Sequence, residues 1–418
     1  MSIRCSYNLK DVEGTDMNNF YNGDEKEREI ISNRLKLKLK KWQSNDKIYK
    51  IIRYDKNYMV IDSAKTIGLF RSVILNDENQ IIAFAPPKSV SVEYFMKNND
   101  LCEQKCIAEE FIEGTMINVF YDNSINAWEF STRSSIGGNI SFFNDSNTKQ
   151  TFRDMFFSTC SYVGLAFEML DKEYCYSFVM QHPSNRIVSP INEMALYLVA
   201  MYKIDQDTFI VHDIDYREYI LTNKKLQNIT IKLPSIYEAT SYYDLIEKFA
   251  SMNTPYAIPG VVIYSPHGYR TKIRNPNYEY VRELRGNQPK LQYQFLCLRK
   301  VRRIVEFLIF YPEYKTYFET FRKQLHQFTQ AVYSNYISCY IKKEKPLIEF
   351  PKQFRSIMYQ LHQMYLNDLR EKKLFVTKQV VIDYINGLHQ SQQMYFLNYN
   401  FRQNQIDIQA CGIDSNEL

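Results

Sequence analysis

Glu-Glu-Phe-Ile-Glu-Gly-Thr-Met-Ile-Asn-Val-Phe-Tyr occupies residues 109–121, and the rest of the chain is organised around this stretch. An acidic residue followed by Gly-Thr, and then by alternating Ile, Val, Phe and Tyr, predicts a tight turn that opens into a strand. One face of such a strand can border a pocket, and the turn can present a reactive side chain. The segments on either side then indicate the fold class and the chemistry.

The amino-acid composition limits the kinds of protein that this chain can be. The chain has 418 residues, of which 45% are hydrophobic, so it can form two or three domains with real cores. A net charge of +5 is mildly basic and does not by itself specify nucleic acid. Eight scattered cysteines are typical of a reduced compartment, and Cys102 and Cys106 lack a second pair at zinc-ligand spacing. With no apolar signal region and no run near the roughly 18 apolar residues of a membrane span, we expect a soluble cytoplasmic protein without a membrane partner.

Strand patterns dominate the chain up to about residue 276. Leu and Lys alternate over residues 35–40, which fits an edge strand, and the charged residues before them fit a helix. Pro86-Pro87 cannot continue a ladder, so Lys88 follows on a rigid exit loop. Interspersed helices without a regular βαβ rhythm predict an α+β class with antiparallel sheets. The further strands are predicted at 48–54, 58–61, 68–75, 81–84, 127–135, 174–181, 194–204, 260–264 and 270–274, and the helices at 152–170 and 241–252.

Beyond Asn275-Pro276 the pattern changes to amphipathic helices separated by prolines. Two basic clusters, at residues 299–303 and 342–345, either contact phosphates or form ordinary solvated faces. The predicted helices are 279–300, 314–341, 354–372 and 378–388. The predicted organisation is an N-terminal extension at 1–45, an α+β domain at 46–280, an all-α domain at 281–400 and a disordered tail at 401–418.

Several short segments follow one another in a recognisable order. They are Arg71, Pro87-Lys88, the Glu-Gly-Thr strand, residues 132–135, residues 176–179 with 185–188, residues 260–262, and residues 272–274. Their succession resembles the nucleotidyltransferase domain of the phage-type RNA ligases over roughly residues 48–276. Residues 111–118 and 285–294 are most similar to RNA-ligase-like proteins of large nucleocytoplasmic DNA viruses. This resemblance implies an ATP-grasp-like antiparallel-sheet domain followed by an all-α domain, in the host cytoplasm or a viral factory.

The resemblance also implies a reaction. In that family a lysine amine attacks the α-phosphate of ATP, the AMP passes to an RNA 5′-phosphate, and a 3′-hydroxyl then displaces it. RNA and a nucleotide are therefore the implied partners, and ATP and Mg²⁺ the implied cofactors. By matching positions, the resemblance assigns contacts with nucleotide or RNA phosphates to Arg71, Lys88, Glu113, Gly114, Arg133, Lys272 and Arg274.

Three positions depart from the family pattern. The lysine nucleophile would stand three residues before the glycine, where this chain has Phe111, and Phe cannot form a phosphoramidate. Ser177 and Pro259 replace carboxylates that would contact ribose and metal. The upstream Lys105 would lie roughly 20 Å from position 111 in an extended strand and cannot substitute. Lys88 is the better candidate for a substitute, and no metal ligand is predicted.

Three functions remain open. In the leading hypothesis the chain is a pseudoenzyme of the RNA ligase family that binds RNA ends or a nucleotide without lysine adenylylation. In the second it is an active ATP-dependent RNA ligase with an atypical nucleophile or pre-adenylylated ends, and in the third a structural scaffold. A phosphate-binding function predicts that five cations line one cleft within about 10 Å, whereas a scaffold does not require this. These cations are Arg71, Lys88, Arg133, Lys272 and Arg274.

Overall fold

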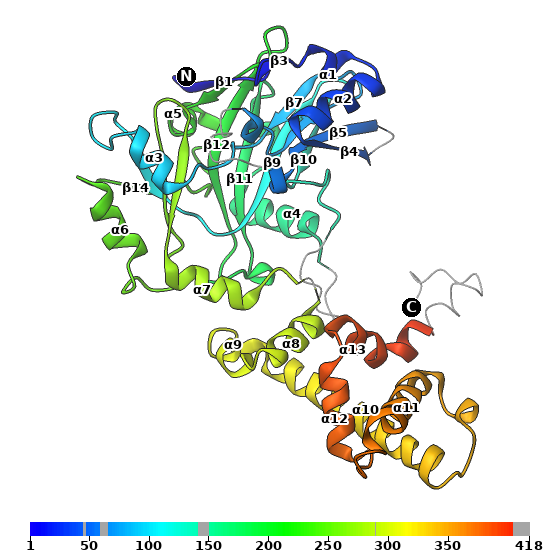
Figure 1. The fold of residues 1–418 in the computed structure, drawn as a ribbon. Helices are drawn as coiled ribbons and strands as arrows, with labels where there is room; N and C mark the ends of the chain where they lie inside the picture. The colour runs from blue at the N-terminus through cyan, green and yellow to red at the C-terminus, as the bar shows by residue number, and fades with distance from the viewer. Residues whose placement is uncertain (45–46, 59–65, 141–149, 289, 404–418) are drawn as a thin grey trace. The chain divides into compact units, whose positions relative to one another are not determined.

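The computed structural model describes residues 1–44, 47–58, 66–140, 150–288 and 290–403 (Figure 1). The described residues form two compact units, one up to Glu283 and one from Leu284 onwards. The first unit contains antiparallel sheets with helices and the second contains helices, which confirms the predicted α+β region followed by a helical region. None of the helices in the described part is long and apolar enough to cross a membrane.

A six-stranded antiparallel sheet forms the centre of the first unit. Helix α4 (Phe152–Val163) packs on one face, where Phe156 and Ile117 share a hydrophobic core. The stretch at residues 109–121 supplies the central strand β9, and β10 pairs with it as predicted. In spatial order the strands are β1 (Ile3–Asn8), β13 (Ile210–Ile214), β12 (Ala195–Ile204), β11 (Tyr174–Gln181), β9 (Thr115–Asp122) and β10 (Ala127–Ser131).

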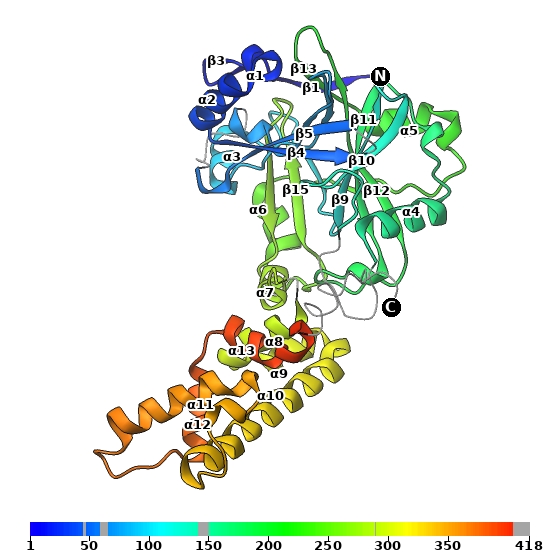
Figure 2. The same ribbon diagram turned by 90° about the vertical axis from the view of Figure 1, so that its right-hand side faces the viewer.

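A four-stranded sheet packs against the other face of the central sheet through a second core. Strand β4 is its edge strand, as the Leu/Lys alternation predicts, and pairs along its length with β5 (Figure 2). Helix α2 (Glu25–Leu35) runs into β4, and Lys36 between them adopts a left-handed conformation that ends the helix. The strands in order are β4 (Leu37–Ser44), β5 (Lys47–Tyr54), β6 (Val73–Leu75) and β7 (Ile81–Phe84).

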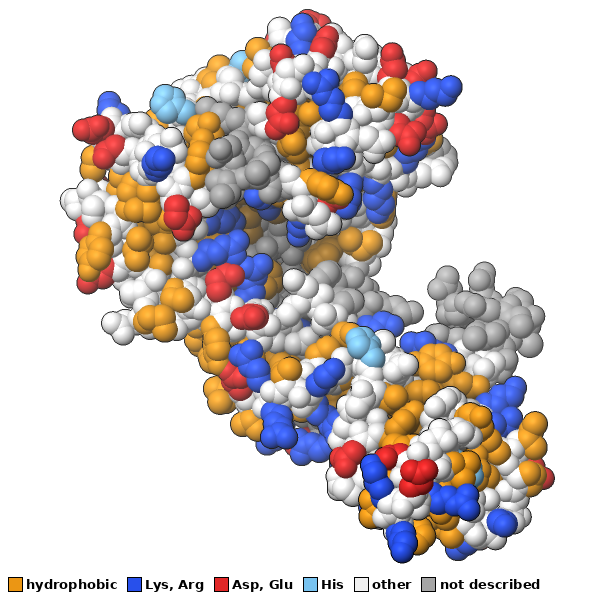
Figure 3. Space-filling view, viewed as in Figure 1, with side chains coloured by type: hydrophobic (Ala, Val, Ile, Leu, Met, Phe, Trp, Pro, Cys, Tyr) orange, Lys and Arg blue, Asp and Glu red, His pale blue; other side chains and the backbone are white. Residues whose placement is uncertain are grey.

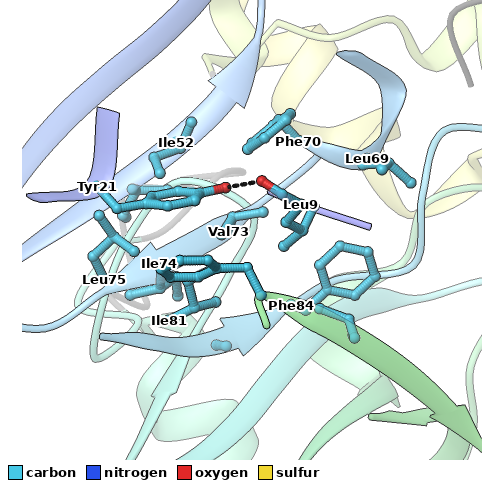
Figure 4. Close-up of a cluster of buried hydrophobic side chains, with 14 of the residues drawn as sticks. Leu9, Tyr21, Ile52, Leu69, Phe70, Val73, Ile74, Leu75, Ile81 and Phe84 are labelled. Atoms are coloured by element: carbon cyan, nitrogen blue, oxygen red, sulfur yellow. Dashed lines mark hydrogen bonds between the residues drawn. The ribbon is translucent and has the colours of Figure 1, made fainter. Parts of the chain in front are cut away.

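The N-terminal residues are integrated into the first unit. Strand β1 pairs with β13, and Leu9 and Tyr21 are fully buried in the core between the sheets. Figure 4 shows the Tyr21 hydroxyl donating to the Leu9 carbonyl over 2.9 Å, beside Ile52 and Phe70. Residues 1–44, which belong to the predicted extension at 1–45 apart from its last residue, therefore contribute strands, helix α2 and core side chains to this unit.

Two predicted strands differ in the structure. Ile67–Leu69 and Lys56–Tyr58 are short 3-10 helices, so the strand predicted at 68–75 begins only at Val73 and that predicted at 58–61 does not start at Tyr58. Residues 59–61 lie outside the described residues. The chain turns at Phe70 and Arg71, where the Tyr54 amide donates to the Phe70 carbonyl, and this turn moves Arg71 off the ladder.

A third sheet carries the cations of the last predicted hairpin. Helices α3 (Val92–Asn98) and α6 (Tyr242–Ala250) cover one face of it with a small apolar core. Residues 111–114 leave its strand β8 and enter β9 of the central sheet, so the predicted turn joins two sheets. The strands in order are β14 (Ile236–Tyr237), β8 (Ile107–Glu110), β15 (Gly260–Tyr264) and β16 (Arg270–Arg274).

The second unit is a set of packed helices. The predicted helix at 279–300 is divided into α7 (Pro276–Arg285), most of which belongs to the first unit, and α8 (Leu291–Lys300), with Gly286 at a φ of 62° between them. Phe318 stacks on Phe307 with ring centroids 5.2 Å apart, so the aromatic residues at helical spacing form core contacts. The remaining helices are α9 (Ile304–Phe310), α10 (Lys315–Tyr336), α11 (Lys352–Met364), α12 (Lys378–Gly387) and α13 (Gln390–Leu397).

A buried polar cluster lies where β1, β8 and β13 approach one another. Glu109 is 2% exposed and pairs with Arg4 at 3.8 Å and with Arg217 at 3.3 Å. Asp213 is also buried beside Arg4, and burial raises the pKa of its carboxyl to about 7 although Arg4 opposes the shift. The folded chain therefore binds a proton at Asp213 more tightly than the unfolded chain does.

This shift predicts that Asp213→Asn gains free energy of unfolding relative to the wild type as the pH rises. Because the folded pKa is raised from 3.8 to about 7, the wild-type free energy of unfolding loses this group's contribution from about pH 4 up to about pH 7. Asparagine does not titrate, so the difference between variant and wild type should grow over that interval and stay constant above it. Urea denaturation across pH 4.5–8.5, followed by fluorescence of Trp42 and Trp128, measures this difference, since both tryptophans lie in the first unit. Asp207→Asn, at an exposed turn, is the control, and a difference that falls as pH rises contradicts the expectation.

Candidate phosphate-binding site

One pocket in the first unit gathers basic side chains, and we call it the cationic pocket. Its volume is about 610 Å³. Eight of its described lining residues are Lys or Arg, and no Asp or Glu is among them. Figure 3 shows Lys and Arg side chains gathered in a hollow of this unit. The lining residues are Tyr54, Lys56, Arg71, Lys88, Ser89, Val90, Ser91, Val92, Arg133, Arg270, Lys272, Arg274 and Arg282.

All five cations that the sequence predicts to converge line this pocket. Arg71 lies in the turn before β6, Lys88 lies on the loop after β7, and Arg133 follows β10. Lys272 and Arg274 lie on β16. Segments that are distant in the sequence therefore bring their charges to one cavity.

Three further cations in the lining were not identified from the sequence. Arg270, Lys272 and Arg274 alternate along β16, so their side chains share one face of the sheet. This period-two pattern in Arg-Thr-Lys-Ile-Arg was a usable signal for Arg270. Lys56 comes from the short helix after β5 and Arg282 from the second turn of α7, and neither position has a local pattern that indicates the pocket.

Two arginines compete for one carbonyl at the back of the pocket. Arg270 Nη2 lies 3.3 Å and Arg71 Nη1 lies 3.5 Å from the Pro86 oxygen, in the rigid loop that the two prolines predict. Arg270 is only 7% exposed, and its Nε has no hydrogen-bond partner among the described residues. Burial lowers the pKa of Arg71 to about 10, with a further contribution from Arg270 and Arg133. The positive charges here thus lie close together, and the hydrogen bonds to the Pro86 oxygen satisfy only some of their donors.

Phe111 stands beside two of the cations. Lys272 Nζ lies 4.0 Å from the centroid of its ring, and the Arg274 guanidinium carbon lies 5.9 Å from it. Aromatic faces attract cations, so the ring stabilises charge where the resemblance places a lysine. Burial lowers the pKa of Lys272 well below its ordinary value, and Arg270, Arg71, Arg274 and Arg282 lower it further.

Among the described residues, salt bridges pair the cations at one edge of the pocket. Arg274 Nη1 lies 2.6 Å from Glu279 Oε1, and Arg282 Nη1 lies 2.9 Å from Glu279 Oε2. Arg133 instead places its guanidinium carbon 5.3 Å from the Tyr54 ring centroid, and its buried Nε has no hydrogen-bond partner among the described residues. An anion in the pocket would find donors that the protein itself does not use.

Glu113 and Gly114 do not line the cationic pocket. The Glu113 carboxylate is 7% exposed and accepts hydrogen bonds from the Val188 amide at 2.8 Å and the Ser189 amide at 3.2 Å. A Cβ at Gly114 would lie 2.4 Å from the Met180 carbonyl oxygen, so close packing of β9 on β11 requires glycine there. The structure therefore gives both residues a role in holding strands and loops together.

Neither position of the missing carboxylates has an acidic replacement. Ser177 is buried and donates to Asn118 Oδ1 over 2.8 Å, and the Pro259 carbonyl accepts from the Asn275 amide. In the described ranges, three or more His, Cys, Asp or Glu residues never gather as a metal site would require. A divalent cation held by the protein does not fit this pocket, whereas the triphosphate of ATP fits its charge.

The basic clusters of the helical unit have partners within that unit. Arg299 Nη2 donates to Asn386 Oδ1 over 2.7 Å, Arg303 pairs with Glu306 at 2.6 Å, and Lys342 lies 3.5 Å from a Glu344 oxygen. Three of the clustered cations therefore have polar partners within the protein, so their positions do not require a bound nucleic acid.

Comparison with known proteins gives one sequence relative. The chain is 24% identical over 285 residues to an RNA ligase of Rhodothermus phage RM378. The match covers 60% of this chain and 64% of the phage protein, so the chain spans less than two thirds of the relative it matches. No protein-family model matches.

Solved structures of ligases give weak likenesses. A putative ATP-dependent DNA ligase from Aquifex aeolicus aligns with a TM-score of 0.40 at 9% identity, over 93% of this chain and 80% of that one. An archaeal ATP-dependent RNA ligase gives 0.38 at 11% identity, over 73% and 72% of the two chains. A Naegleria gruberi RNA ligase mutant with ATP and Mn gives 0.34 at 10% identity, over 66% and 84%. Scores of this size carry no argument about kinship, and the sequence match is what makes this chain similar to an RNA ligase.

Proposed function

We propose that this chain binds the phosphates of an RNA end or of a nucleotide in the cationic pocket, without a covalent lysine step at position 111. The observation that carries the proposal is the lining of the pocket, which has eight cations and no carboxylate among its described residues. A cavity of about 610 Å³ is within the usual size of small-molecule sites. RNA as the ligand rests on the family, because the pocket itself selects for anionic charge.

Uncompensated buried charge supports this proposal. A charge removed from water costs free energy unless it is paired, and Arg270 is nearly buried with an unused Nε donor. Arginine presents its donors in a planar fork that matches phosphate oxygens, so the same groups are ready-made phosphate ligands. A purely structural protein has no need for unpaired cations that lower its stability in this way.

Binding of 5′-phosphorylated RNA tests the proposal. We expect wild-type affinity to fall steeply with salt, because each phosphate contact releases counterions. Lys272→Ala with Arg274→Ala should weaken binding at least about tenfold and reduce the salt slope by roughly 1.4, two contacts at about 0.7 each for single strands. Fluorescence anisotropy with a labelled oligonucleotide over a salt series measures both quantities.

The control is Lys203→Ala with Lys225→Ala, which removes two exposed lysines that do not line the pocket. This pair should leave the slope within error of wild type. A 5′-hydroxyl oligonucleotide of the same sequence tests whether the terminal phosphate is recognised. Absence of binding to either RNA and to ATP at low salt would leave the scaffold hypothesis in place.

A further inference from the structure

We propose that Glu279 is an internal competitor for the cationic pocket and determines which anions the pocket accepts. The Glu279 carboxylate holds donors of Arg274 and Arg282, two of the lining cations, and a phosphate chain that reaches this edge must displace it. The inference rests on the proposed function, because it concerns the same pocket. It adds a specificity-determining residue and a class of ligand, a chain of condensed phosphates.

The carboxylate of Glu279 lies against two guanidinium groups as a bound anion would. Its Oε1 accepts from Arg274 Nη1 over 2.6 Å and from Arg282 Nη1 over 3.0 Å, and its Oε2 accepts from Arg282 Nη1 over 2.9 Å. Guanidinium donors bind carboxylate and phosphate oxygens alike, so a phosphoryl group can replace this carboxylate. The two arginines therefore form an anion subsite that the chain's own glutamate occupies.

Helix α7 holds Glu279 at this subsite. The helix starts at Pro276, directly after Asn275, whose buried side-chain amide donates to the Pro255 and Ile258 carbonyls over 2.8 Å each. Glu279 lies in the first turn, where the helix dipole also favours a negative charge. Because the start of the helix is anchored in this way, a ligand can displace the side chain of Glu279, which is 37% exposed, without moving the helix.

The cations of β16 lead inward from this subsite. Arg270, Lys272 and Arg274 alternate on one face of the strand, and at roughly 3.3 Å per residue their row is about 13 Å long. The row runs from Arg270, which is 7% exposed, to Arg274, whose side chain is 40% exposed. A single phosphoryl group can bind at the inner end beside Arg270 and leave Glu279 in place, whereas a chain of condensed phosphates also reaches Arg274. Glu279 thus lowers the affinity for the longer anion more than for the shorter one.

Anion titration tests the inference. The full-length chain is titrated with sodium tripolyphosphate and, separately, with orthophosphate, by isothermal titration calorimetry in EDTA at constant ionic strength. We expect Glu279→Gln to bind tripolyphosphate about three- to tenfold more tightly than the wild type, since two partly exposed ion pairs no longer have to be broken. Its affinity for orthophosphate should change less.

Glu283→Gln is the matched control. Glu283 lies one turn further along α7, is exposed and has no ion pair among the described residues, so this variant removes the same charge from the same helix. It should leave both affinities within error of the wild type. Urea denaturation of the three proteins in phosphate-free buffer shows whether a changed affinity comes from a changed fold.

A double-mutant cycle identifies where Glu279 and the ligand compete. Arg282→Gln should weaken tripolyphosphate binding, because it removes a cation of the subsite. The gain from Glu279→Gln should be smaller in the Arg282→Gln background, since the carboxylate and the ligand then share only Arg274. A glutamate that only stabilises α7 would have the same effect on affinity in both backgrounds.

The outcomes separate this inference from the proposed function. Equal tripolyphosphate affinities of the wild type and Glu279→Gln overturn the role of Glu279 and leave phosphate binding intact. Equal gains in Glu279→Gln and Glu283→Gln, or equal gains for the two anions, overturn it as well, because a general effect of charge then explains the change. Absence of binding of RNA and of both anions overturns both proposals. A gain confined to Glu279→Gln, larger for tripolyphosphate and reduced in the Arg282→Gln background, supports the inference.

Discussion

Gly260→Ala should destabilise the first unit by about 3–5 kcal/mol, a combined cost of steric overlap and backbone strain. A Cβ at this position would lie 2.0 Å from the Ile273 carbonyl oxygen and 3.0 Å from the Arg274 Cα, and the backbone has a φ of +122°. The first contact is with backbone, so no side-chain rotation relieves it. The pairing of β15 with β16 must shift, and Lys272 and Arg274 shift with it. Urea denaturation monitored by the fluorescence of the two tryptophans measures the loss.

Gly14→Ala separates steric overlap from strain. Gly14 has a φ of +70°, but a Cβ added there would have no heavy atom within 4 Å, so its substitution should cost only about 1–2 kcal/mol. The two variants thus share an unfavourable backbone conformation and differ in the overlap. Equal losses for both variants would show that β16 moves freely against β15, and would contradict the steric cost expected for Gly260→Ala.

The fold was most predictable where residue periodicity coincides with turn chemistry. The hairpin at 260–264 and 270–274 was predicted with the observed bounds, because an apolar run and a run with alternating basic residues flank the Ser-Pro-His-Gly turn. The edge strand β4 followed from alternating Leu and Lys. Residues 1–8 show no such pattern, since β1 is a mostly exposed edge strand whose position depends on pairing with β13. That long-range pairing could not be deduced from local sequence.

The sequence identified five of the eight cations that line the pocket, but not the direction in which each site side chain points. The five cations that the resemblance assigned to phosphate contacts line one pocket, and the resemblance rather than a local sequence pattern was the basis for expecting this. Glu113 illustrates the limit, since the same sequence pattern allows a carboxylate to face a pocket or to bind the amides of Val188 and Ser189. Arg282 illustrates another, because a single arginine on a helix carries no sign of the cavity it borders. Side-chain direction in irregular segments depends on tertiary packing.

Phe111→Lys should lower the free energy of unfolding by about 1–3 kcal/mol in phosphate-free buffer at pH 7, a range that allows for screening by solvent. The substitution removes the ring that lies 4.0 Å from Lys272 Nζ and adds a cation among others that are already crowded. Pyrophosphate should restore much of the loss, because an anion that binds only the folded state stabilises it by mass action. Denaturation with and without pyrophosphate, followed by tryptophan fluorescence, gives both values.

Phe111→Leu is the matched control, since it removes the ring without adding charge. Its loss should be smaller than that of Phe111→Lys and insensitive to pyrophosphate. If the lysine and leucine variants unfold alike in phosphate-free buffer, the crowding of cations at Lys272 and Arg274 does not have the energetic effect that their positions imply. If they differ as expected, the loss in Phe111→Lys comes from the added charge, which the crowded cations of β16 cannot accommodate before an anion arrives. Restoring a lysine there would then increase the affinity for pyrophosphate and lower stability, while Ser177 and Pro259 would still supply no carboxylate.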